Sequence, residues 1–133
     1  MTPPPATILI VDDRLELAEN IAEILSGEGY STEVVDSAES AMERALHGGF
    51  DALITDFRLP GKSGAQLIEE LSRMGASVPA IVMSAYTDPA TIENAQSAGA
   101  ICFVPKPVDV PKMLGCLERA LHGDGDGTPH LHV

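Results

Sequence analysis

Five polar side chains of the sequence stand at the end of a short apolar run or within two residues of it. They are three carboxylates, one hydroxyl and one amine: Asp12, Asp13, Asp56, Ser84 and Lys106. If the runs are parallel strands, their carboxyl ends share one edge of the sheet, which is where ligands bind in open α/β folds. The sequence therefore predicts a site that combines several carboxylates with one ammonium group.

This combination of groups suits a metal ion and a phosphoryl group. Carboxylates packed together repel one another, and a cation that joins them removes the repulsion. An all-oxygen set with few protein ligands suits Mg²⁺, which is octahedral and keeps several waters. Lys106 adds a second positive charge, and Ser84 could donate a hydrogen bond to a phosphoryl oxygen. One of the aspartates is then free to attack phosphorus as a nucleophile.

Each of these residues also has an ordinary structural interpretation. Asp12 and Asp13 could cap a helix, and Asp56 could stand in a turn. Lys106 alone could be a solvated surface charge, and Ser84 could simply end its strand. Their coincidence at one sheet edge favours the shared functional role.

The apolar runs themselves predict five strands. Four are continuously hydrophobic, which is typical of strands that are covered on both faces of a parallel sheet: Ile8–Val11, Ala52–Ile54, Ala80–Met83 and Ile101–Val104. The fifth, Ser31–Val35, alternates between polar and apolar residues and fits an edge strand better.

Helical patterns separate the strands. Apolar residues recur at helical spacing in five segments: Leu15–Leu25, Ala38–Leu46, Leu67–Met74, Asp88–Ala95 and Met113–Leu121. Glycines follow the first three segments, and Asp88-Pro89 is a typical helix start. Strand and helix thus alternate five times, and right-handed crossovers then give a doubly wound α/β domain.

Composition restricts the class of protein. The net charge of −12 over 133 residues disfavours unaided binding to nucleic acid or to an anionic membrane. No apolar run approaches a membrane span, and no signal peptide is visible, so we expect a cytoplasmic protein. Cys102 and Cys116 stand in apolar segments and are interpreted as small core residues in a reducing compartment. We predict one domain over residues 7–122, a disordered lead-in over 1–6 and a flexible tail or linker stub over 123–133.

Four motifs, in this order, give the chain a family resemblance. They are Ile8–Asp13, Asp51–Gly61, Met83–Ala85 and Phe103–Pro107. With them the chain resembles the response-regulator receiver domains of two-component signalling, over roughly Thr7–Leu121. The resemblance implies a flavodoxin-like fold with five helices and a five-stranded parallel sheet in the order 2-1-3-4-5.

The resemblance also implies roles for the polar residues. Asp56 would be the phospho-acceptor and a ligand of Mg²⁺, which Asp13 would bind directly. Asp12 would assist from the first or second shell of ligands, and the backbone carbonyl of Arg58 would be a further ligand. Lys106 would pair with the phosphoryl group.

The same resemblance implies a switch. Ser84 would sense the phosphoryl group, and the side chain of Phe103 would follow it. The family often has Tyr at this position, and Phe cannot make the hydroxyl contact. The Lys106-Pro107 peptide bond would be cis.

The function implied is that of a signalling switch and not of an enzyme, beyond self-catalysed phosphotransfer and dephosphorylation. A histidine kinase or phosphotransfer protein would phosphorylate Asp56 in a Mg²⁺-dependent reaction. The surface of the fourth helix, last strand and last helix would then change its preference for a downstream protein or an output domain. A homodimer would use the same surface.

Two alternatives use the same fold or the same chemistry. One is a pseudo-receiver, an interaction module that never takes phosphate. The other is a Mg²⁺-dependent phosphatase of the haloacid-dehalogenase type, which would want a second acid two residues after its nucleophile, where this chain has Arg58. An FMN-binding domain is disfavoured, because Asp12 and Asp13 would repel its phosphate.

Arg58 and Tyr86 each stand two residues past a predicted site residue. They could shield an acyl phosphate from water, or they could be ordinary surface residues. The sequence leaves both interpretations open.

Overall fold

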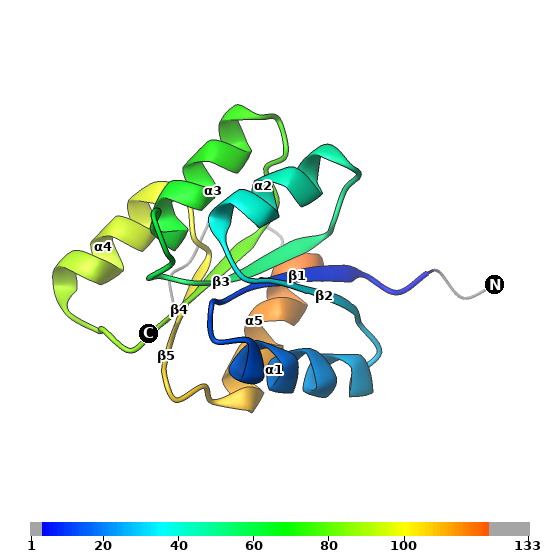
Figure 1. The fold of residues 1–133 in the computed structure, drawn as a ribbon. Coiled ribbons are helices and arrows are strands. Elements are labelled where there is room, and N and C mark those ends of the chain that lie inside the picture. Colours follow the sequence, from blue (N-terminus) through cyan, green and yellow to red (C-terminus); the bar gives the residue numbers. More distant parts are fainter. Residues whose placement is uncertain (1–3, 123–133) are drawn as a thin grey trace.

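The computed structural model describes residues 4–122 and forms one five-stranded parallel sheet between two layers of helices (Figure 1). The strands are β1 (Thr7–Val11), β2 (Ser31–Val35), β3 (Ala52–Asp56), β4 (Ala80–Ser84) and β5 (Cys102–Pro105). The helices are α1 (Leu15–Gly27), α2 (Ala38–Leu46), α3 (Gly64–Arg73), α4 (Pro89–Ala98) and α5 (Val110–His122). Every strand is followed by a helix, so the predicted alternation is confirmed.

The strand order is β2-β1-β3-β4-β5. The order that the family resemblance implied is therefore confirmed. β2 pairs only with β1, and its residues are half-buried or exposed, whereas β1, β3 and β4 are almost completely buried. The prediction of an edge strand over Ser31–Val35 is confirmed as well.

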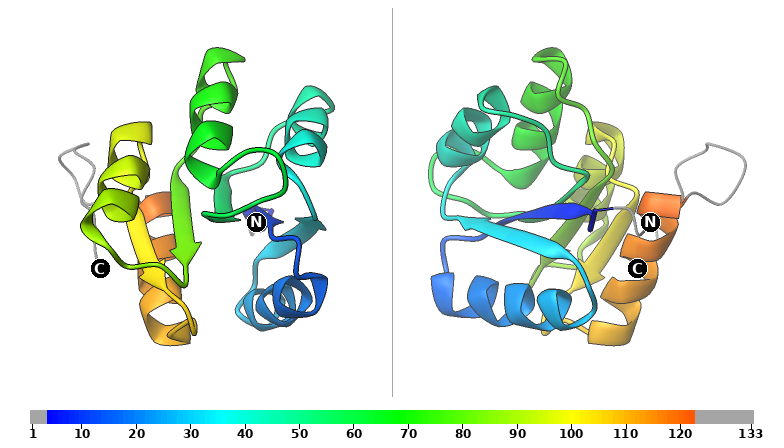
Figure 2. Two further views of the ribbon diagram at one scale, coloured as in Figure 1. Left: turned by 60° about the vertical axis from the view of Figure 1, so that its left-hand side comes forward. Right: turned by 90° about the vertical axis from the view of Figure 1, so that its right-hand side faces the viewer.

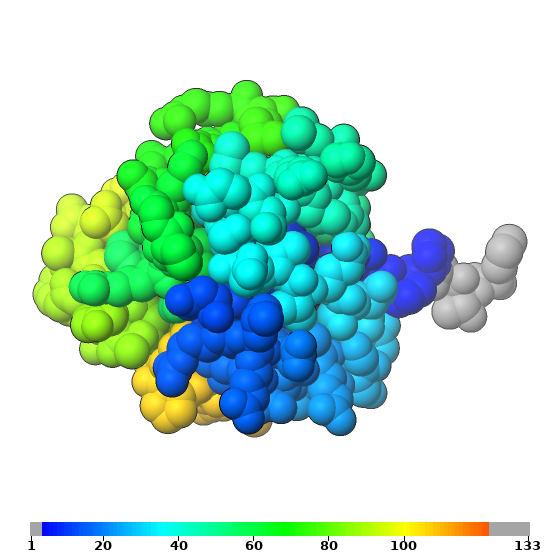
Figure 3. Space-filling model, viewed as in Figure 1, coloured from blue at the N-terminus to red at the C-terminus, as the bar shows by residue number. Residues whose placement is uncertain are grey.

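Two hydrophobic clusters hold the helices to the sheet. In the views of Figures 1 and 2, α2, α3 and α4 cover one face, and α1 and α5 cover the other. Alternate residues of β1 enter the two clusters: Ile8 and Ile10 pack on the side of α1 and α5, and Leu9 and Val11 on the opposite side. A strand covered on both faces must be apolar at every position, which explains the continuous runs in the sequence. The space-filling view of Figure 3 shows α1 (blue) packed below α2 (cyan), with α4 (yellow-green) at the left.

Three strands end later than the apolar pattern predicted. β3 includes Asp56, β4 includes Ser84 and β5 includes Pro105, whereas the apolar runs end at Ile54, Met83 and Val104. The ladder continues because backbone hydrogen bonding does not depend on side-chain polarity: the N–H of Phe57 donates to the carbonyl of Met83 over 2.8 Å. The side chains of Asp56 and Ser84 thus stand on the last residue of rigid strands.

The start of α3 also differs from the apolar pattern, since the helix begins at Gly64 instead of Leu67. Ser63 and Gln66 form a capping box, in which each side chain accepts a hydrogen bond from the other residue's backbone N–H. A Cβ atom on Gly64 would overlap with the carbonyl oxygen of Asp56. Glycine therefore lets the first turn of α3 approach the end of β3 closely.

Other expectations concern the ends of the chain. No helix of residues 4–122 is long and apolar enough to cross a membrane. Residues 1–3 of the predicted lead-in and the whole of the predicted tail, 123–133, lie outside the described residues. The domain limits at residues 7 and 122 stay a prediction.

Replacing Gly64 tests the close approach of α3 to β3. The Cβ of Gly64→Ala would overlap with backbone that cannot rotate away, so we expect the free energy of unfolding to fall by about 1–3 kcal/mol. Denaturant titration measures this. Gly27→Ala is the matched control, because Gly27 is helical and has nothing within 4 Å of its Cβ position. Equal stability of the two variants would contradict the proposed overlap.

Candidate functional site

The polar residues that the sequence singled out meet at the carboxyl edge of the sheet. One carboxylate oxygen from each of Asp12, Asp13 and Asp56 lies within 4.8 Å of the other two. The Nζ of Lys106 lies 3.0 Å from Oδ2 of Asp12 and 3.3 Å from Oδ1 of Asp56. Three carboxylates and one ammonium, contributed by residues at the ends of β1, β3 and β5, therefore form one cluster.

Burial separates the members of this cluster. Asp12 is completely buried and Asp56 is 8% exposed, whereas Asp13 is exposed. Asp12 also accepts a hydrogen bond from the backbone N–H of Arg14 over 2.9 Å, so it both ties down the start of the β1–α1 loop and holds Lys106. Asp13 is therefore the carboxylate of the cluster that is most accessible to an ion from solvent.

The electrostatics of Asp56 reflect this crowding. Burial raises the pKa of the Asp56 carboxyl, and the nearby charges of Asp12 and Asp13 add to the rise, while Lys106 opposes it. Burial is the main cause of the rise, and Lys106 lowers the pKa more than either neighbouring carboxylate raises it. Three carboxylates nevertheless face one ammonium group, and this excess of negative charge would favour a further cation.

The donor set fits Mg²⁺. The ion takes oxygen ligands at about 2.0–2.1 Å in an octahedron, so ligand oxygens lie at most about 4 Å apart. Carboxylate oxygens that are all within 4.8 Å of one another can close on such an ion with small adjustments. Asp13, Asp12 and Asp56 would hold it; the part predicted for the Arg58 carbonyl stays a prediction.

Ser84 and Phe103, the residues predicted to form a switch, lie on the neighbouring strands β4 and β5. The Oγ of Ser84, at the end of β4, accepts a hydrogen bond from the backbone N–H of Tyr86 over 2.9 Å. A hydroxyl that accepts one bond still has its own hydrogen to donate. Phe103 is fully buried on β5, on the α2–α4 side of the sheet. The Lys106-Pro107 bond is cis, as the resemblance implied.

Arg58 and Tyr86 come together above the sheet edge. The guanidinium carbon of Arg58 lies 4.0 Å from the centre of the Tyr86 ring, which is a cation–π contact. The sequence placed each residue near the site but not in contact with the other. Their equal spacing from Asp56 and Ser84, which end neighbouring strands, is the signal that could have predicted the pair.

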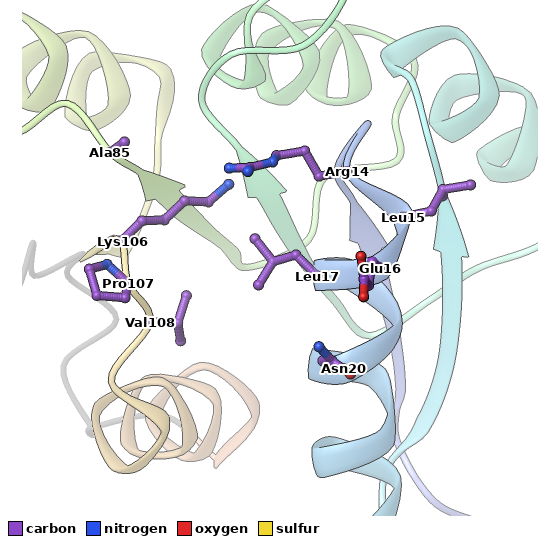
Figure 4. Close-up of a pocket in the computed structure, with 9 residues that line it drawn as sticks. All are labelled: Arg14, Leu15, Glu16, Leu17, Asn20, Ala85, Lys106, Pro107 and Val108. Atoms are coloured by element: carbon purple, nitrogen blue, oxygen red, sulfur yellow. The ribbon is translucent and has the colours of Figure 1, made fainter.

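Two features of the site were missed by sequence reasoning. Gly64 packs against the backbone of Asp56. A cleft of about 750 Å³ opens between the start of α1 and the loop after β5 (Figure 4). Figure 4 shows Arg14 and Lys106 pointing toward each other across it, with the apolar side chains of Leu17 and Val108 below them. No single sequence motif predicts this cleft, because the residues that line it come from segments far apart in the sequence.

Comparison with known proteins agrees with this geometry. The family model of the response regulator receiver domain matches residues 8–118. A response regulator receiver protein of Anaeromyxobacter sp. (strain Fw109-5) is 40% identical over 106 residues, which cover 80% of this chain and 44% of that protein. The chain spans 56% of the length of the transcriptional regulatory protein FixJ of Rhizobium meliloti and 24% of that of the regulator NtrC of the same organism.

Solved structures show the same fold. The crystal structure of FixJ-N has a TM-score of 0.82 at 30% identity, over 92% of this chain and 96% of that one. A response regulator of Burkholderia pseudomallei, solved with a phosphorylated aspartic acid, a calcium ion and citrate, has a TM-score of 0.76 at 27% identity, over 87% and 66% of the two chains. Sequence match, fold and site together show that this chain belongs to the response regulator receiver domain family.

Proposed function

We propose that Asp56 accepts a phosphoryl group from a histidine kinase or phosphotransfer protein in a Mg²⁺-dependent reaction. The observation that carries the proposal is the cluster itself: Asp56 ends β3 with Lys106 3.3 Å away and two further carboxylates beside it. The related protein from Burkholderia pseudomallei contains a phosphorylated aspartic acid, which supports the same chemistry here. We assign this function to residues 7–122 as one unit.

Each side chain has a defined task in the transfer. An oxygen of the ionised Asp56 carboxylate attacks phosphorus, and the bond from phosphorus to the donor's nitrogen breaks as the new O–P bond forms. Lys106 balances the charge on the transferred oxygens, and Ser84 can donate a hydrogen bond to one of them. Bound Mg²⁺ would supply further positive charge beside Asp13 and Asp12.

The response of the domain would involve α4, β5 and α5. α4 buries only Ala95 completely, whereas α3 buries residues along a whole face. A weakly anchored helix can shift at low cost when Ser84 turns to the phosphoryl group and Phe103 follows. The α4-β5-α5 surface would then bind a downstream protein, an output domain or a second copy of the chain more tightly.

Incubation with acetyl phosphate and Mg²⁺ tests the phospho-acceptor directly. We expect one phosphoryl adduct in the intact mass of the protein, with no adduct when the metal is chelated. Asp56→Asn should not be labelled, because the amide is not a nucleophile toward phosphorus. Glu93→Gln, an exposed carboxylate on α4, is the control that should behave as wild type.

The outcomes separate the alternatives. A phosphoryl adduct in Asp56→Asn would show that another residue is the phospho-acceptor. A folded wild-type protein that neither acetyl phosphate nor a phosphorylated kinase can label would be a pseudo-receiver, and the proposal would be wrong.

The burial of Asp56, with the carboxylates beside it, predicts a pH dependence of stability. Because the pKa of Asp56 is higher in the folded state than its usual 3.8, the folded protein loses stability as the pH rises through the folded pKa. Asp56→Asn removes this penalty, so the variant should be more stable than wild type at pH 7 and lose that advantage near pH 3.8. Urea titration of both proteins across this range, with Glu93→Gln as control, measures the difference. A constant difference at all pH values would contradict the electrostatic explanation.

The stacked pair above the site predicts an effect on phosphate lifetime. If Arg58 and Tyr86 shield the acyl phosphate, Tyr86→Ala should speed its loss about two- to fivefold, as the removal of a contact of about 0.5–1 kcal/mol implies. The decay of the phosphorylated mass after removal of the donor gives the rate. Tyr86→Phe keeps the ring and should decay as wild type does. An unchanged half-life in Tyr86→Ala would leave both residues as ordinary surface side chains.

A further inference from the structure

Two buried thiols that the phosphotransfer chemistry does not use lie side by side between β5 and α5. Cys102 is on β5 and Cys116 is on α5, and both belong to the cluster between the sheet and the α1–α5 layer. Their burial confirms that they occupy core positions, as the sequence predicted. The structure adds that they are neighbours.

The guanidinium group of Arg119 contacts both sulfurs. The Nη2 of Arg119 donates to Sγ of Cys116 over 3.5 Å and to Sγ of Cys102 over 3.8 Å. Arg119 is itself an exposed residue, and it folds back along α5 over Gly115, where its Nη1 lies 3.7 Å from the position of a Cβ. A flexible charged side chain therefore lies between the two thiols and solvent.

The two thiols differ in acidity. A hydrogen bond from the Cys116 thiol, with help from Arg119, lowers the pKa of Cys102 to about 7 in spite of its burial. The pKa of Cys116 is raised, because its thiol donates that bond and is buried. A thiolate beside a protonated thiol is the arrangement of an attacking and a resolving cysteine.

We propose that Cys102 and Cys116 form a peroxide-sensitive dithiol that closes to a disulfide between β5 and α5. The Cys102 thiolate attacks one oxygen of a hydroperoxide, the O–O bond breaks, and a sulfenic acid forms. Hydroxide or an alkoxide leaves and takes up a proton from solvent to become water or an alcohol. The Cys116 sulfur then attacks the Cys102 sulfur, and its proton leaves with the hydroxyl group as water. The two thiols are oxidised by two electrons and the peroxide is reduced by two.

The position of the pair gives the oxidation a structural consequence. α5 forms the outer layer on its side of the sheet (Figure 2), and Cys102 directly precedes Phe103 on β5. Local opening of α5 gives a small peroxide access to the sulfurs. The disulfide would fix α5 to β5, two of the three elements of the proposed partner surface. This last step rests on the proposed function, whereas the thiol chemistry does not.

Mass spectrometry of the folded protein tests the proposal. The reduced chain is treated with hydrogen peroxide, then unfolded and alkylated. We expect a product that has lost two hydrogens, resists alkylation at both cysteines and yields a Cys102–Cys116 cross-linked peptide. In Cys116→Ser, a 1,3-dione should trap the sulfenic acid on Cys102.

Because Cys116→Ser changes a core residue and could impair folding, a variant of the exposed Arg119 gives a second test. Arg119→Gln should slow the oxidation about tenfold, because the cation favours the thiolate. Arg73→Gln, a last-turn arginine on α3, is the matched control and should react as wild type does. Asp56→Asn should also oxidise normally, which separates this proposal from the phosphotransfer proposal.

Three results would overturn the inference. In the first, both thiols stay reduced in the folded protein although they oxidise in urea. In the second, the disulfides formed join separate chains. In the third, Arg119→Gln is oxidised as fast as wild type, which would show that the guanidinium group does not activate the Cys102 thiol.

Discussion

The ion pair between Asp12 and Lys106 is the interaction on which the arrangement of the site depends. It joins residues 94 positions apart in the chain, at the ends of β1 and β5, across the ends of β3 and β4. Asp12 is fully buried, and a buried charge without a partner would be strongly destabilising. Lys106 must therefore reach over the sheet edge, and on its way it meets Asp56. The same ammonium that balances the buried carboxylate stands beside the phospho-acceptor that we propose.

This reach is only feasible because the strands end in register. Asp56 pairs with Met83 and Ser84 pairs with Pro105, so the last residues of β3, β4 and β5 lie next to one another. The register is held by side chains that are apolar on both faces and would be exposed by a slip along the sheet. Polar side chains gather where that apolar ladder ends. Hydrophobic burial, which carries no chemical function, thus sets the geometry of the functional groups.

The two sides of the molecule differ in how firmly they are held. Next to the acidic cluster, Gly64 and the capping box of Ser63 press the first turn of α3 against Asp56, which favours a rigid acceptor. Farther along the sheet, α4 buries only Ala95 completely, while Ile92 and Ala98 pack against the same cluster at partial burial. Between these extremes, α5 packs closely and brings its Cys116 to Cys102 of β5. A rigid Asp56 beside a helix with little complete burial would suit the phosphorylation switch that we propose.

The sequence by itself determined the five strands and five helices, the edge position of Ser31–Val35 and the identity of the charged cluster, because burial on both faces leaves a pattern in consecutive residues. It underestimated β3 and β4, since backbone pairing continues through polar residues. The Arg58–Tyr86 stack and the neighbouring thiols of Cys102 and Cys116 were decided only by the tertiary structure. These contacts join different elements, and their geometry depends on strand order and helix packing, which no local pattern encodes. Gly64 was predictable only in part. Its position just before the third apolar helical segment is visible in the sequence, but only the tertiary structure shows that the carbonyl of Asp56 leaves no room for a side chain there.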